Sequence, residues 1–140
     1  MNGPAPEPIV FAPLTRTDLV RYAGASGDFN PLHHDHAFAT AAGLHDVMGH
    51  GMLSAGLLGS AVTTWFGAGS VKNFTVRFRS PVWPGDRLTA TCRFREGDAD
   101  GTAEVDLLLS RGPDDVVVAG VATVRLDRAL AAREQKVGEK

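Results

Sequence analysis

A stretch of 21 residues without a charged side chain, 51–71, is the strongest constraint on how this chain folds. The stretch is long enough in principle to cross a bilayer, but ten of its residues are Gly, Ser or Thr, and Gly67 and Gly69 interrupt its end. A helix is expected over Gly51–Phe66, and because none of its faces carries a charge, other parts of the protein must wrap it. The sequence therefore predicts a helix buried in a folded protein and not a membrane span.

Four segments that follow this helix alternate apolar and polar residues, as strands do. They are expected near 74–79, 87–95, 103–109 and 116–126, and the last is apolar enough to lie inside a sheet. Turn-forming residues such as Pro84-Gly85-Asp86 separate these segments. An apolar helix followed by four strands with short turns predicts an α+β fold, an antiparallel sheet curled around one helix.

Two short helices are expected before the long one. Thr15 is followed three residues later by Asp18, which resembles a capping box and predicts a helix over about Thr17–Ala25. Asp35 can cap a second short helix that runs through Ala42. The chemistry-bearing loop discussed below lies between these two helices.

The chain of 140 residues has the size of one domain. Segment 1–8, with three prolines, and the mixed-charge segment 127–140 are expected to be tails on a domain that covers 9–126. A net charge of -2 and a pI near 6.2 provide no general basic field for a nucleic-acid backbone. The single cysteine, Cys92, permits no internal disulfide, and the N-terminus has no apolar run of signal-peptide length. We expect a cytoplasmic protein that binds neither nucleic acid nor membrane.

The most informative segment for chemistry is the loop that contains Asp28 and His33. Asn30-Pro31 holds the chain extended between them, and Gly27 can take a backbone angle closed to other residues. Such a loop can aim the carboxylate and the imidazole at one point. If both contact a water, one group can take a proton from it while the other supplies a proton to carbon, and Asn30 can orient the water or a carbonyl. The loop predicts a site that adds or removes water.

Two motifs at a fixed separation carry a family resemblance. Gly-Asp-Phe-Asn-Pro-Leu-His-x-Asp at 27–35 and His-Gly-Met at 50–52 resemble the MaoC-type, (R)-specific enoyl-thioester hydratases and 3-hydroxyacyl-thioester dehydratases. The resemblance covers roughly 14–95. It implies the hot-dog fold and a catalytic pair, Asp28 and His33. It further implies that the Gly51 N–H at the helix N-terminus polarises the thioester carbonyl, a role that the helix dipole supports.

Segments 13–24 and 63–67 look most like the catalytic subunits of hydroxyacyl-carrier-protein dehydratases of the mycolic-acid type. The resemblance implies an acyl-thioester substrate, an acyl carrier protein among the partners, and a homodimer or a heterodimer with a related hot-dog subunit. It implies no resident cofactor, because the substrate itself carries coenzyme A or phosphopantetheine. Some relatives place a helical serine near the substrate, for which Ser54 and Ser60 are the candidates here.

Other interpretations of the same residues stay open. Asp28 could cap a turn, and His33-His34-Asp35-His36 contains metal-ligand residue types, although adjacent residues seldom point the same way. His50 is expected to be a structural hydrogen-bonding partner near the helix start. Two other functions compete with a hydratase, namely an acyl-thioesterase and a non-catalytic acyl-binding subunit. The long helix has no Asp or Glu, which argues against enzymes that use a helix carboxylate.

Arginines gather on the polar faces of two expected strands. They are either a solvated sheet face or a positive patch suited to the phosphates of coenzyme A or to an acidic carrier protein. The residues are Arg77, Arg79, Arg87, Arg93 and Arg95.

Overall fold

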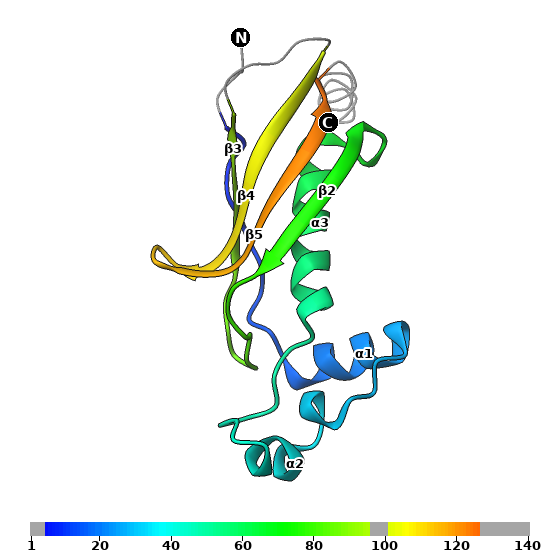
Figure 1. The fold of residues 1–140 in the computed structure, drawn as a ribbon, viewed down its shortest axis with the longest axis vertical. Coiled ribbons are helices and arrows are strands. Elements are labelled where there is room, and N and C mark those ends of the chain that lie inside the picture. Colours follow the sequence, from blue (N-terminus) through cyan, green and yellow to red (C-terminus); the bar gives the residue numbers. More distant parts are fainter. Residues whose placement is uncertain (1–4, 96–100, 127–140) are drawn as a thin grey trace.

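The computed structural model describes residues 5–95 and 101–126, which form one five-stranded sheet and three α-helices (Figure 1). The strands are β1 (Ile9–Val10), β2 (Val71–Phe78), β3 (Thr89–Phe94), β4 (Thr102–Gly112) and β5 (Asp115–Arg125). The α-helices are α1 (Arg16–Ser26), α2 (His36–Ala41) and α3 (Gly51–Phe66), and two 3-10 turns are η1 (Pro31–His33) and η2 (Ala68–Ser70).

The sheet has the order β1-β3-β4-β5-β2, and every neighbouring pair is antiparallel. Helix α3 runs along the strands, while α1 and α2 lie beyond its N-terminal end (Figure 1). Leu58, Val62 and Phe66 of α3 are buried in one core with the inward-facing residues of β4 and β5. This arrangement is the expected α+β hot-dog fold.

The expected helix boundaries are confirmed. Thr15 accepts a hydrogen bond from the Asp18 N–H (3.1 Å), and the Asp18 carboxylate accepts one from the Thr15 N–H (2.8 Å), so the capping box of α1 is complete. Asp35 caps α2 by accepting from the Phe38 N–H at 3.0 Å. Helix α3 has the predicted bounds.

The expectation that other parts of the protein wrap α3 on every side is wrong for the single chain. The sheet buries one side of the helix, including Leu58 and Trp65, but the opposite side is exposed. Its hydroxyl groups bond to the helix itself, as when Ser60 Oγ donates to the Leu57 carbonyl (2.8 Å). An uncharged helix is thus wrapped on one side only. The exposed stripe contains Met52, Gly56, Ser60 and Thr63.

The strands differ from expectation mainly at their ends. Strand β2 begins at Val71, and β4 and β5 extend to a tight hairpin around Pro113-Asp114. The two-residue strand β1 was not predicted, because two residues carry no alternation. The expected tails lie largely outside the described residues, so the domain bounds stay a prediction. In the part of the chain that the structure describes, no helix has the length and hydropathy to span a bilayer.

Candidate active site

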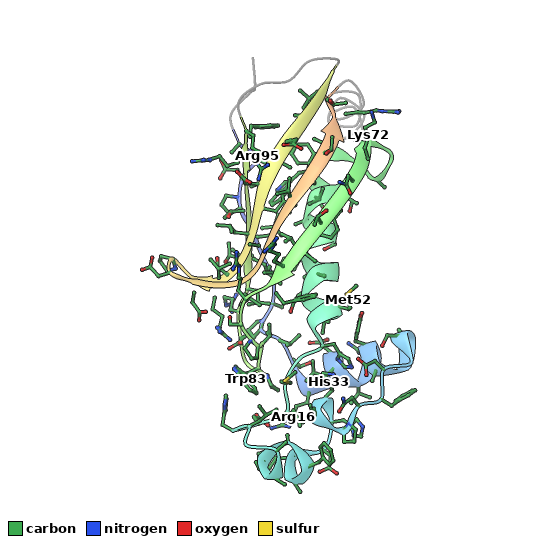
Figure 2. All side chains as sticks on the ribbon, viewed as in Figure 1. Arg16, His33, Met52, Lys72, Trp83 and Arg95 are labelled. Atoms are coloured by element: carbon green, nitrogen blue, oxygen red, sulfur yellow. The ribbon has the colours of Figure 1, made fainter. Side chains whose placement is uncertain are left out.

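The loop between α1 and α2 brings Asp28 and His33 together, as the sequence predicts. Asp28 Oδ2 lies 3.7 Å from His33 Nε2. The two side chains differ in environment, because Asp28 is 52 % exposed and His33 is 8 % exposed. Figure 2 shows His33 where α1 and the start of α3 approach each other.

Local hydrogen bonds fix this loop. Gly27 ends α1 in the left-handed region (φ 74°), which favours glycine. The Asp28 N–H donates to Ser26 Oγ (3.2 Å), and the Asn30 N–H donates to Asp28 Oδ1 (3.3 Å). Asn30 Oδ1 accepts from the Leu32 N–H (3.0 Å) and so caps η1. The predicted part of Asn30 in orienting water or substrate stays a prediction.

A main-chain carbonyl sets the tautomer of His33. Its Nδ1 lies 2.7 Å from the Met48 carbonyl oxygen, so Nδ1–H donates to that oxygen. In the neutral ring, Nε2 then carries a lone pair and faces Asp28. The 3.7 Å separation from Asp28 Oδ2 is too long for a direct hydrogen bond but suits one water that contacts both atoms.

His50 supports Asp28 and His33 through a hydrogen bond and ring stacking, in the structural role that the sequence predicts. Its Nε2–H donates to the Asp28 carbonyl oxygen at 3.1 Å. Its ring stacks on that of His33 (centroids 3.7 Å apart) and receives the edge of Tyr22 (4.8 Å). Within the described residues, His50 Nδ1 is buried and has no hydrogen-bond partner. Sequence reasoning missed Tyr22 and Met48, and Met48 acts through its main-chain carbonyl, which gives no side-chain signal.

The histidines do not gather around a common point. Asp28, His33 and His50 do offer ligand atoms within 4.8 Å of one another. However, the His33 and His50 ring planes lie only 24° apart, so their lone pairs run in nearly parallel planes and do not converge at a zinc–nitrogen distance of about 2 Å. His34 Nε2 bonds to the Phe29 carbonyl instead, and His36 bonds to Asp46.

A cavity of about 280 Å³ lies at the N-terminus of α3. Gly51 and Ser54 line it together with Met48, Phe78 and Arg79. The first N–H groups of a helix have no partner within the helix, and among the described residues no side chain caps α3. A Cβ on Gly51 would lie 3.3 Å from the Phe78 ring, so glycine keeps this corner open.

Of the two helical serines considered, only Ser54 lines this cavity. Ser54 is 3 % exposed, whereas Ser60 is exposed and bonds to its own helix. Met48 joins the loop that contains His33 to the cavity, since its carbonyl holds His33 and the residue lines the cavity. The predicted residues Asp28, His33, Gly51 and Ser54 therefore belong to one region. It can hold a water and polarise a carbonyl.

Comparison with known proteins identifies the family. A family model described as a MaoC like domain matches residues 3–108. The chain belongs to the MaoC-like family. The (R)-specific enoyl-CoA hydratase of Aeromonas caviae is 34% identical over 117 residues, which cover 78% of this chain and 84% of that protein. The 3-hydroxyacyl-thioester dehydratase Y of Mycobacterium tuberculosis is 40% identical over 96 residues, 65% of this chain and 33% of that protein.

Solved structures of MaoC-like hydratases share the fold. The (R)-hydratase from A. caviae superimposes with a TM-score of 0.76 at 27% identity, covering 88% of this chain and 96% of that one. The R-hydratase PhaJ1 from Pseudomonas aeruginosa gives 0.75 at 29% identity, covering 85% and 79%. The ChsH1-ChsH2 complex from M. tuberculosis contains a chain with the same fold at 23% identity, a TM-score of 0.76 and coverage of 88% and 95%.

The chain spans only part of the length of some curated relatives. It spans 10% of a peroxisomal hydratase-dehydrogenase-epimerase of Neurospora crassa and 56% of an (R)-specific enoyl-CoA hydratase of Rhodospirillum rubrum. The proteins compared above are named hydratases and dehydratases, that is, hydro-lyases.

Proposed function

We propose that this MaoC-like protein catalyses the reversible hydration of trans-2-enoyl thioesters to (R)-3-hydroxyacyl thioesters. The observation that carries the proposal is the pair Asp28 and His33, with 3.7 Å between Oδ2 and Nε2, beside the uncapped N-terminus of α3. The names of the relatives support the same reaction, and their stated (R) specificity supports the hand of the product.

In the hydration direction, one water contacts Asp28 Oδ2 and His33 Nε2. Its oxygen bonds to C3 of the enoyl group as the pair accepts the proton that the water loses. Negative charge moves to the thioester oxygen, where the Gly51 N–H and the dipole of α3 stabilise it. The pair then returns a proton to C2. A hydroxyl and a hydrogen have been added, and the pair has its original protonation state.

Coenzyme A or phosphopantetheine enters the site as part of the substrate. We propose that the site holds no metal and no resident cofactor, because acid–base chemistry by two side chains and one helix N-terminus accounts for each step. The stacking of His33 on His50 supports this, since it directs their lone pairs in nearly parallel planes.

The functional unit that we propose contains a second hot-dog subunit, identical or related. In the described part of the chain, strand β2 is an edge of the sheet and pairs with β5 alone. Beside the cavity, Phe78 is 52% exposed and Met52 is 62% exposed. A partner that covers β2 would also bury the uncharged exposed side of α3. Two fold neighbours, ChsH1-ChsH2 and HadBC, are named as complexes, which supports a second subunit.

The test is to mix the protein with crotonyl-coenzyme A and follow two signals, the absorbance of the conjugated double bond and the release of free thiol. Loss of the double bond without thiol release is expected, and Asp28→Asn or His33→Ala should lower turnover at least roughly 100-fold. His45→Ala is the matched control, because His45 is exposed and its ring packs on Trp83, outside the loop that contains Asp28 and His33. Thiol release would identify a thioesterase. If neither signal changes, the protein is a non-catalytic subunit.

A further inference from the structure

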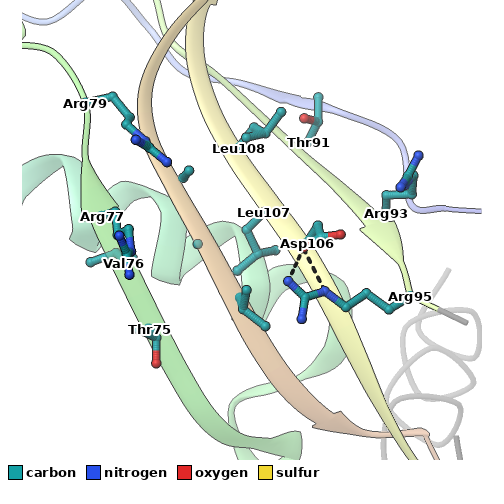
Figure 3. A pocket seen from close by; sticks show the side chains of 13 residues that line it. Thr75, Val76, Arg77, Arg79, Thr91, Arg93, Arg95, Asp106, Leu107 and Leu108 are labelled. Atoms are coloured by element: carbon teal, nitrogen blue, oxygen red, sulfur yellow. Dashed lines mark hydrogen bonds and ion pairs between the residues drawn. The ribbon is translucent and has the colours of Figure 1, made fainter. Parts of the chain in front are cut away.

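The outer face of the sheet, opposite α3, is hollowed into a cavity of about 530 Å³ (Figure 3). Its floor is formed by small and apolar side chains of β4 and β5, among them Leu108 (40% exposed) and Val121. Its two sides are formed by arginines that lie on β2 and β3 or directly follow them. We call this feature the guanidinium groove, defined by the banks Arg77 and Arg79 on one side and Arg93 and Arg95 on the other.

The groove carries excess positive charge. Arg95 bonds to Asp106 (2.8 Å) and to Glu104 (3.2 Å), so its charge is balanced. Among the residues that the structure describes, Asp106 is the one acidic residue that lines the groove. Within the described residues, Arg77, Arg79 and Arg93 are exposed and form no ion pair with a carboxylate. Three guanidinium groups thus face solvent above an apolar floor, in a chain whose net charge is -2.

The width of the groove points to the shape of what it binds. Between β2 and β3 lie β5 and β4, so the banks are three strand spacings apart, about 14 Å. An α-helix with its side chains is about 10–12 Å across and fits between the banks. Banks this far apart suit carboxylates on the two flanks of a helix better than the converging oxygens of one phosphate. The apolar floor matches a helix with an apolar stripe between those flanks.

The groove lies next to the cavity at the N-terminus of α3. Arg79 lines both the groove and the cavity that contains Gly51 and Ser54. A partner seated between the banks therefore ends next to the mouth of that cavity. A flexible thioester arm on such a partner could enter the cavity from there.

We propose that the guanidinium groove docks an acidic amphipathic helix of the protein that carries the acyl thioester. This inference rests on the proposed hydratase function and names its natural substrate class, a thioester on a carrier protein. Binding combines the apolar floor with charge pairing to Arg77, Arg79 and Arg93, so it weakens as salt rises.

The test compares one acyl group on three carriers: crotonyl-acyl carrier protein, crotonyl-coenzyme A and crotonyl-pantetheine. The variant is the double substitution Arg77→Ala with Arg93→Ala, which spares Arg79 because that residue also lines the catalytic cavity. The matched control carries Arg87→Ala and Arg125→Ala, two arginines that do not line the groove. We expect at least a tenfold loss of kcat/KM for the carrier-protein thioester, mainly through KM, and little change for the other two.

Three results would overturn the proposal. An unchanged kcat/KM with the carrier-protein thioester would remove the groove from docking. An equal loss with crotonyl-coenzyme A but not crotonyl-pantetheine would show that the arginines bind the phosphates of coenzyme A. An equal loss in the control variant would show a general effect of net charge.

Direct binding separates this proposal from the proposed function. Fluorescence anisotropy with a labelled acyl carrier protein should show salt-sensitive binding that the groove variant weakens at least tenfold and the control does not. If no thioester is hydrated, the proposed function fails, while this measurement still decides whether the groove docks the carrier. Binding that does not depend on Arg77 and Arg93 would contradict the docking proposal alone.

Discussion

Two hydrogen bonds to main-chain carbonyls position the groups of the loop that contains Asp28 and His33. The Met48 carbonyl holds His33 Nδ1–H, which leaves Nε2 facing Asp28. The Asp28 carbonyl in turn accepts from His50 Nε2–H, so the residue that stacks on His33 also holds the backbone of Asp28. One buried imidazole thereby fixes both members of the pair, and we infer that His50 is a positioning residue.

We predict that His50→Ala lowers kcat roughly tenfold and changes KM little. The substitution removes the stacking surface under His33 and leaves the Asp28 carbonyl without its donor, and a loosened acid–base pair loses rate more than binding. His50→Gln, which keeps an N–H donor, should recover part of the loss. Steady-state kinetics on variants shown to be folded by circular dichroism make the test. A folded His50→Ala protein with wild-type kcat would contradict the positioning role.

At this scale the sequence identifies side chains and misses main-chain groups. Asp28 and His33 could be predicted because a carboxylate and an imidazole flank an Asn-Pro turn. The carbonyl of Met48 could not, since any residue carries a carbonyl and only the fold brings this one to 2.7 Å from His33. Tyr22 was not predicted either, because its contact with His50 depends on where the fold places α1 relative to the start of α3.

Close packing of neighbouring strands makes Gly120 the most constrained glycine of the sheet. A Cβ on Gly120 of β5 would lie 2.8 Å from the Thr75 carbonyl oxygen of β2 and 3.3 Å from the Val76 side chain. Since the obstructing atom belongs to the backbone, a strand must move. We predict that Gly120→Ala lowers the free energy of unfolding by about 1–3 kcal/mol, as measured by urea denaturation. Gly112→Ala is the matched control, because nothing lies within 4 Å of its Cβ position. Equal effects of the two substitutions would refute the steric argument.

The periodicity of apolar residues predicts strands and helices that bury one face. It misses elements that form only because segments distant in the sequence pair. The alternation of Ala103, Val105, Leu107 and Leu109 placed β4 correctly, and all four are buried. Strand β1 exists only because Ile9 and Val10 meet Ala90 and Thr89 across the sheet. The uncharged composition of α3 predicts a covered helix, yet this chain alone covers one side. We propose that a second subunit supplies the missing cover.

Arg111 connects the β4–β5 hairpin to the loop between β2 and β3. It donates to both carboxylate oxygens of Asp115 (2.7 and 3.1 Å) and to Asp86 Oδ2 (2.7 Å) and the Pro81 carbonyl (2.8 Å). That loop also contains Val82, whose carbonyl accepts from the Gly49 N–H at 2.7 Å, two residues before α3. The hairpin of β4 and β5 is thus connected to the backbone that leads into the site.

Stability should depend on pH through this cluster. Hydrogen bonds from the Arg111 guanidinium hold the pKa of Asp115 below its usual value of 3.8. A lowered folded-state pKa stabilises the fold above the unfolded-state pKa, and this contribution disappears as the pH falls through the folded-state pKa. We predict that Asp115→Asn lowers the urea midpoint at pH 7 and that the difference from wild type shrinks progressively below about pH 4. Asp114→Asn is the control, as Arg111 bonds to Asp115 and not to its neighbour. A difference that stayed constant between pH 7 and pH 3 would contradict this assignment.

The whole molecule exposes apolar surface next to its catalytic site. Phe78 lines the cavity and Met52 follows Gly51, which also lines it, and both side chains are exposed. Within the described residues, the edge strand β2 is paired on one side. We predict a dimer or a larger assembly in dilute solution, and Phe78→Asp should both dissociate it and lower turnover. Val20→Asp, which changes an exposed aliphatic residue on α1, should do neither. Analytical ultracentrifugation with activity assays on the same samples gives the answer. A fully active wild-type monomer would rule out the need for a partner.

The central claim is that Asp28 and His33, held 3.7 Å apart on one short loop, act on one water. Both groups therefore approach the double bond from the same side, and the hydroxyl and the new hydrogen must be delivered to the same face. The most direct measurement is hydration of crotonyl-coenzyme A in deuterated water, with the product examined at C2 and C3 by NMR. The account predicts syn addition, and anti addition would contradict it because it requires the two groups to lie on opposite sides of the substrate.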